Sequence, residues 1–88
     1  MKNDDQNEIA TVAKLKWACR RGMLELDIIL GQFLDNGYPW LPDEDKRLFV
    51  RLLDQSDPDL FAWLMGNAEP DDPTLQYIIN KIRKHARA

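Results

Sequence analysis

Apolar residues recur along the chain at helical spacing, in five segments separated by short polar connectors. The expected helices span about residues 8–20, 23–36, 43–54, 57–65 and 72 into the basic end of the chain. No segment shows a convincing strand pattern, and connectors of a few residues between helices of this length are typical of helical bundles. The sequence therefore predicts an all-α fold, a compact bundle of about five short helices.

The second expected helix is apolar around most of its circumference. Its two apolar rows are Leu26, Ile29, Leu30 and Phe33, and beside them Leu24, Ile28 and Leu34. A helix of this kind must be covered on several sides, which places it at the centre of the bundle. Asn36 and Gly37 end it, and the aromatic residues of the loop Tyr38–Pro42 are expected to fold back over the core as a lid.

Helix-start signals support the other boundaries. The acidic run 43–45 suits the positive end of a helix dipole. Asp57 is expected to cap the fourth helix and Asp72 the fifth, because a proline follows each of them at the preferred first helical position. Gly22 is expected to stop or kink the first helix.

Length and composition indicate a single folded domain. The chain has 88 residues, of which 44% are hydrophobic and 31% charged. We expect a disordered tail over residues 1–7, a helical domain over 8–84 and a basic tail over 85–88. The net charge of −3 argues against general nucleic-acid binding. One cysteine, Cys19, cannot form an internal disulfide, which suits a reducing compartment.

The beginning of the chain is polar and acidic, unlike a secretory signal or a mitochondrial presequence. No apolar run approaches the roughly 20 residues that a membrane span requires. We therefore expect a complete cytoplasmic protein with no membrane insertion.

No residue pattern supports catalysis by this chain. His85 stands alone in the basic tail, where a frayed surface position explains it best. The cations beside Cys19 can lower the pKa of a thiol, yet a small buried residue at the end of the first helix is the better explanation. The paired acidic residues fit helix starts and match no metal loop. We expect no enzyme activity, no metal site and no stably bound cofactor.

The stretch from Trp17 to Asp27, W-A-C-R-R-G-M-L-E-L-D, combines cations, a glycine, a carboxylate and large apolar groups. If Gly22 caps the second helix, Glu25 occupies the third position and can complete half of a capping box. Arg21 could then pair with Glu25 at the surface. The doubled arginine next to Trp17 equally suits a docking surface. The residues alone leave both interpretations open.

The run Arg21-Gly22-Met23-Leu24-Glu25 matches the R-G-x-x-E signature of the SdhE family, the FAD assembly factors of succinate dehydrogenase. The chain resembles a bacterial member of that family. A first block over residues 17–27 and a second over 43–65 resemble the family's two blocks in order and spacing. One departure is Pro42, which stands where a Ser or Thr cap of the third helix is expected.

The resemblance implies a chaperone for covalent flavin attachment. Family members bind the flavoprotein subunit of succinate dehydrogenase, and in bacteria that of fumarate reductase, and FAD becomes attached to a histidine of that client. FAD is then the client's cofactor, and its chemistry belongs to the flavin and its host. The residues implied to contact the client are Arg21, Gly22 and Glu25, surrounded by Trp17, Arg20, Met23 and Asp27.

Two other functions stay open. A general helical adapter, or an antitoxin-like regulatory protein, could use the same patch for a different partner. A small nucleic-acid binder could use the cations around Trp17, although the acidic total disfavours it.

Overall fold

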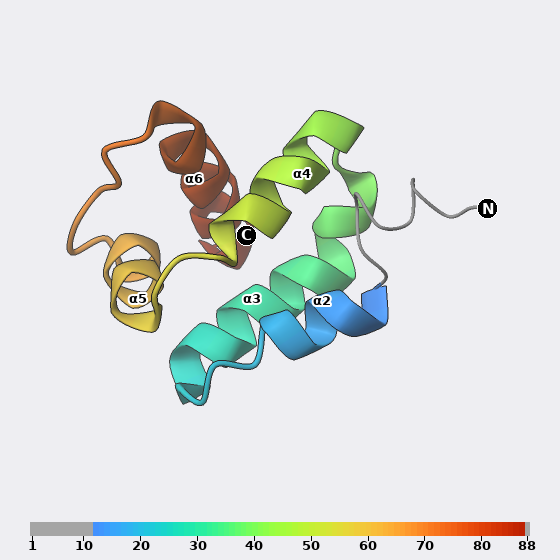
Figure 1. Ribbon diagram of the computed structural model, residues 1–88, viewed down its shortest axis with the longest axis horizontal. Coiled ribbons are helices and arrows are strands. Elements are labelled where there is room, and N and C mark those ends of the chain that lie inside the picture. The colour runs from blue at the N-terminus through green and yellow to red at the C-terminus, as the bar shows by residue number, and fades with distance from the viewer. Residues whose placement is uncertain (1–11, 88) are drawn as a thin grey trace.

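The computed structural model describes residues 12–87 and is helical throughout its regular elements (Figure 1). They are α2 (Val12–Ala18), α3 (Leu24–Asn36), the 3-10 turn η1 (Tyr38–Trp40), α4 (Asp43–Leu52), α5 (Asp57–Met65) and α6 (Pro73–Arg87). The predicted all-α bundle of about five short helices is confirmed, and no strand occurs in these residues. The expected tail over 1–7 and the start of the first expected helix lie outside the described residues.

Helix α3 occupies the centre, as predicted. It packs against α2, η1, α5 and α6, and α6 in turn covers α4 and α5. Figure 1 shows α2 lying alongside α3, with α5 and α6 on the other side of the molecule. The largest fully buried side chains are Leu26, Leu30, Phe49, Leu52, Leu60, Ile78, Ile79 and Ile82. Each contributes roughly 1.5–3 kcal/mol through burial, so this shared core holds the helices together.

The second apolar row of α3 is covered only in part, unlike the prediction. Leu34 is buried, whereas Ile28 is 47% exposed and Leu24 is 75% exposed. Helix α2 packs against α3 without covering Leu24 or Ile28, so the N-terminal part of this row faces solvent.

Of the two aromatic rings that were predicted to fold back over the core, only one does so. Tyr38 is buried and its ring centroid lies 5.4 Å from that of Phe49, which in turn lies 5.4 Å from that of Phe33. Trp40 is 83% exposed and covers nothing.

Two helix starts differ in how far they match the predictions. Asp72 caps α6 as expected, because its Oδ1 accepts from the Thr74 backbone N–H at 2.9 Å. The cap of α5 is Ser56 and not Asp57, since the Ser56 hydroxyl accepts from the backbone N–H of Asp59 at 3.3 Å. Asp57 is instead the first residue of the helix, which leaves its carboxylate available for another contact.

The acidic start of α4 contains a group that the dipole argument overlooked. Asp45 is only 5% exposed. Its Oδ2 accepts from the Tyr77 hydroxyl at 2.9 Å and pairs with the Lys81 ammonium at 3.2 Å. These contacts connect α4 to α6. Hydrogen bonds to Tyr77 and Asp45 raise the pKa of Lys81.

The expected basic tail over 85–88 is wrong for residues 85–87, which continue α6. The His85 ring meets the Phe33 ring edge-on, with centroids 5.4 Å apart, and is half-buried and not frayed. In the described part of the chain, no helix is long and apolar enough to cross a membrane.

Candidate partner-binding site

The bend between α2 and α3, residues 19–23, depends on Gly22. Its φ is +87°, in the left-handed region that strains any other residue. A Cβ placed there would meet no heavy atom within 4 Å, so backbone conformation and not internal crowding requires the glycine. Gly22 is exposed, and its open surroundings leave room for a partner to approach the backbone closely.

Asp27 fixes the backbone of this bend. Its Oδ1 accepts from the Arg21 N–H at 2.7 Å and its Oδ2 from the Gly22 N–H at 3.2 Å. The residue in the N-cap position, Met23, offers no side-chain cap, so Asp27 satisfies donors just before the helix instead. Asp27 was expected among the partner contacts, but its carboxylate is engaged within the chain.

Glu25 does not complete a capping box. Met23 occupies the N-cap and Glu25 is the second residue of α3, not the third as a Gly22 cap would require. Its side chain is exposed, and no hydrogen bond or ion pair joins it to another described residue. The carboxylate therefore faces solvent at the positive end of the helix dipole.

Arg21 faces inward, contrary to its expected role as an outward cation. Its Nε donates to Asp57 Oδ1 at 2.7 Å, and only 15% of its side chain is exposed. Its Nη1 donates to the carbonyls of Ala18 at 2.8 Å and Leu53 at 2.9 Å. Its Nη2 donates to the Gln55 carbonyl at 2.7 Å. Arg21 therefore does not form the surface ion pair with Glu25 that the sequence left open.

Large apolar side chains around the bend are exposed. Trp17 is 72% exposed, and the Arg20 guanidinium lies 5.7 Å from the centroid of its ring. Leu24, in the motif itself, is 75% exposed. Met23, expected in the contact ring, is half-buried and packs against the core. We define the bend surface by its exposed members, Trp17, Arg20, Gly22, Leu24, Glu25 and Ile28.

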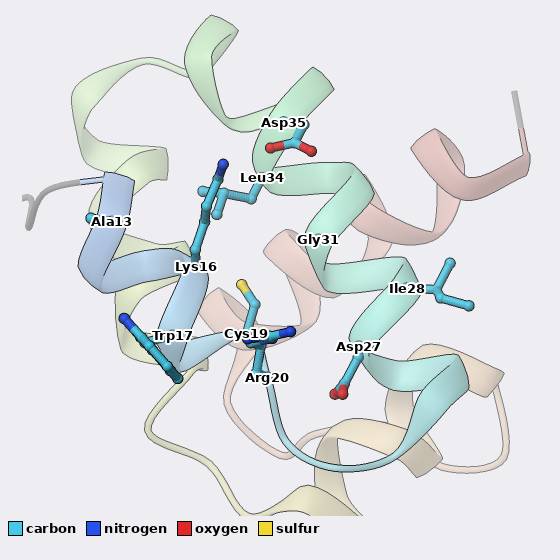
Figure 2. Close-up of a pocket in the computed structure, with 10 residues that line it drawn as sticks. All are labelled: Ala13, Lys16, Trp17, Cys19, Arg20, Asp27, Ile28, Gly31, Leu34 and Asp35. Carbon is cyan, nitrogen blue, oxygen red and sulfur yellow. The ribbon is translucent and has the colours of Figure 1, made fainter.

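A groove of about 510 Å³ lies beside the bend, between α2 and α3. Figure 2 shows its lining residues, which come from α2 and the bend on one side and from α3 on the other. Trp17, Arg20 and Asp27 were expected at the site, whereas Lys16, Ile28 and Asp35 were missed. Ile28 lies one turn after Leu24, so the uncovered row on α3 was the signal available in the sequence.

Cys19 lies at the floor of this groove and is buried, as expected. It is 2% exposed, and its Sγ lies 3.9 Å from the Leu30 carbonyl oxygen. Burial is the main cause that raises the pKa of the thiol to about 11. The positive charge of Arg21 lowers this pKa, and the negative charges of Asp27 and Asp35 raise it. The thiol therefore stays protonated near neutral pH and is no activated nucleophile. In the part of the chain that the structure describes, no group of three or more His, Cys, Asp or Glu residues is placed to hold a metal ion.

Comparison with known proteins identifies the family. The family model for the flavinator of succinate dehydrogenase matches residues 13–86, which include the whole site. The chain belongs to this family. Among the relatives of the flavinator family, the FAD assembly factor SdhE of Shewanella oneidensis is 51% identical over 79 residues, covering 90% of this chain and 96% of that protein. SdhE of Pectobacterium atrosepticum is 51% identical over 76 residues and covers 86% of both chains.

A solved structure of similar fold agrees with this assignment. The solution structure of a UPF0350 protein superimposes with a TM-score of 0.72 at 39% identity, over 99% of this chain and 87% of that one. The predicted resemblance to the bacterial SdhE proteins is confirmed.

Proposed function

We propose that this flavinator-family chain binds the flavoprotein subunit of succinate dehydrogenase and promotes covalent attachment of FAD to a histidine of that subunit. The match of the family model to residues 13–86 carries this proposal. The names of the relatives agree, since each is called an FAD assembly factor. We expect the protein to act in the cytoplasm and to accept the corresponding subunit of fumarate reductase as a second client.

The bend surface is the proposed docking site. It combines an exposed indole, an exposed leucine and an unpaired carboxylate within five residues of a glycine. Exposed apolar groups gain free energy when a partner covers them, and aromatic residues often dominate binding. Glu25 would accept from cationic or amide groups of the client, while Gly22 allows its backbone to approach closely.

The chain acts by holding its client and supplies no catalytic group. The bond to the flavin forms through the chemistry of the flavin and its host subunit. A chaperone that stabilises the client with histidine and flavin aligned can accelerate the step, because alignment alone contributes up to about 7–11 kcal/mol in favourable cases. We propose that FAD remains the client's cofactor and is not bound stably by this chain.

A reconstituted flavinylation assay tests the function. A bacterial apo flavoprotein subunit is incubated with FAD, with and without this chain, and in-gel fluorescence is measured after denaturation, so that only covalent flavin is scored. The chain is expected to increase covalent flavin severalfold. Equal covalent flavin in both samples, under conditions where the chain is folded, contradicts the proposal.

Glu25→Ala tests the docking site, and Glu44→Ala is its matched control. Both glutamates are exposed and are the second residue of a helix. Both substitutions therefore lose the same dipole interaction, roughly 0.3–1 kcal/mol. Glu25→Ala is expected to abolish the gain in covalent flavin, and Glu44→Ala to retain it. Equal activity of the two variants would remove Glu25 from the proposed site.

A further inference from the structure

Arg21 joins three parts of the chain through one guanidinium. Its four hydrogen bonds reach Ala18 at the end of α2, Leu53 and Gln55 between α4 and α5, and Asp57 at the start of α5. Three of these acceptors lie 32 to 36 residues further along the sequence. The bend between α2 and α3 is therefore fastened to the α4–α5 connection.

Only arginine can make this set of contacts. Its planar guanidinium carries five N–H donors in a fixed arrangement, and the four contacts use four of these donors in different directions. Lysine presents three donors on a single atom and cannot reach four separate acceptors. An arginine whose only purpose was to meet a client would keep its donors free.

The anchored segment leads directly to the bend surface. Arg21 is the residue before Gly22, and its own backbone N–H is held by Asp27. Loss of the guanidinium contacts would release the bend from α5, so that Gly22 and Glu25 would sample many arrangements. A client would then have to order them on binding, which weakens affinity.

We propose that Arg21 is a positioning residue for client binding, and that Asp57, outside the R-G-x-x-E motif, is its essential partner in this role. The Asp57 carboxylate is the only charged acceptor in the set, and charge-assisted hydrogen bonds are about twice as strong as neutral ones. This inference rests on the proposed function, because it concerns how the same surface is presented to the client.

Asp57→Asn tests the proposal, with Asp72→Asn as the matched control. Asp72 forms an ion pair of similar length with Arg51, and its side chain is 35% exposed against 38% for Asp57. Binding of each variant to the apo flavoprotein subunit is titrated at a temperature where circular dichroism shows full folding. We expect Asp57→Asn to raise the Kd at least fivefold, Asp72→Asn to change it less than twofold, and Asp57→Glu to restore most of the affinity.

A double-mutant cycle separates positioning from a general effect on stability. If Asp57 acts by presenting the bend, Asp57→Asn should change the Kd less than twofold when Glu25 is already alanine. A fivefold effect in both backgrounds, or none in the parent chain, overturns the positioning role. If Glu25→Ala itself binds the client like the parent, the docking site of the proposed function has failed, and this outcome is distinct from the first two.

Discussion

The starts of α3 and α6 use similar residues in different ways. Each lies beside an Arg–Asp ion pair, Arg21–Asp57 at 2.7 Å and Arg51–Asp72 at 2.6 Å. At α6, Asp72 also caps the helix through Thr74, so the pair and the cap share one surface carboxylate. At α3, Met23 supplies no cap, and the arginine side chain turns away into the fold.

The difference extends to the neighbouring side chains. Just after the start of α6, Leu75 is buried, whereas Leu24 at the start of α3 is 75% exposed. Glu25 has no partner among the described residues, while the carboxylate of Asp72 has three donors around it. The start of α6 is satisfied within the chain. The start of α3 leaves apolar surface and a carboxylate for another molecule, although four of the five N–H donors of its arginine are engaged within the chain.

Removal of the two arginines should give the largest contrast. Arg21→Ala leaves a carboxylate and three carbonyls without their donor, and we expect it to lower the free energy of unfolding by roughly 3 kcal/mol. Arg51 is half-exposed, so Arg51→Ala should cost no more than about 1 kcal/mol. Urea unfolding measures both. Equal losses would mean that Arg21 contributes no more than a surface ion pair.

Two exposed tryptophans allow a second contrast. Trp17→Ala should weaken client binding about 30-fold, equivalent to about 2 kcal/mol, because an exposed indole at the bend surface is expected to anchor the complex. Trp40→Ala, at a ring that is 83% exposed in η1, should leave the Kd unchanged. Both should keep their stability within about 0.5 kcal/mol. A titration in which both variants bind equally well would remove Trp17 from the interface.

The architecture could be predicted because its signals are local. Apolar periodicity located each helix within a few residues, and the Asp72-Pro73 pair gave the start of α6. Local signals failed where two residues compete for one role. Ser56 and Asp57 are both good caps, and the pattern cannot show that Asp57 is drawn to an arginine 36 residues earlier.

The sequence predicts a candidate site at the bend, and its internal contacts could not be predicted. The motif lies at the bend between α2 and α3, where Gly22 and Glu25 are exposed. The Arg21 side chain points inward because it donates to the carbonyls of Leu53 and Gln55, which come within reach only after α5 packs. The residues next to Arg21 in the sequence could not indicate this orientation. The exposure of Leu24 likewise depends on which sides of α3 the other helices pack against.

Two glycines with positive φ give a smaller contrast. Gly22 has a φ of +87° and Gly66, which ends α5, a φ of +82°. Alanine at either position should cost about 1–2 kcal/mol, because both backbones are left-handed. At Gly66 the nearest atom to a new Cβ is Arg83 Nη2 at 3.0 Å, the movable end of a long side chain. Thermal unfolding should therefore show similar losses, while only Gly22→Ala should reduce covalent flavin. Loss of flavinylation in both variants would indicate that stability alone limits the assay.

Ionisation of the buried Cys19 thiol should have the smallest effect on the free energy of unfolding, and this effect depends on pH. The pKa of Cys19 is about 11 in the folded chain, against 9.0 for an unperturbed cysteine, because burial disfavours the thiolate. The unfolded chain therefore loses this proton first, and stability that is complete below pH 9 falls as pH rises toward 11. At pH 10 the loss should be about 1 kcal/mol.

Cys19→Ala isolates this contribution. Burial and the nearby Asp43 carboxylate also raise the pKa of Tyr38, so the parent chain should lose stability from two groups in this range. Urea unfolding from pH 7 to 10 should show a shallower decline for Cys19→Ala than for the parent, and the difference belongs to the thiol. Parallel declines would mean that Cys19 ionises as easily in the folded chain as in the unfolded one, and that a thiol near the bend surface is open to solvent.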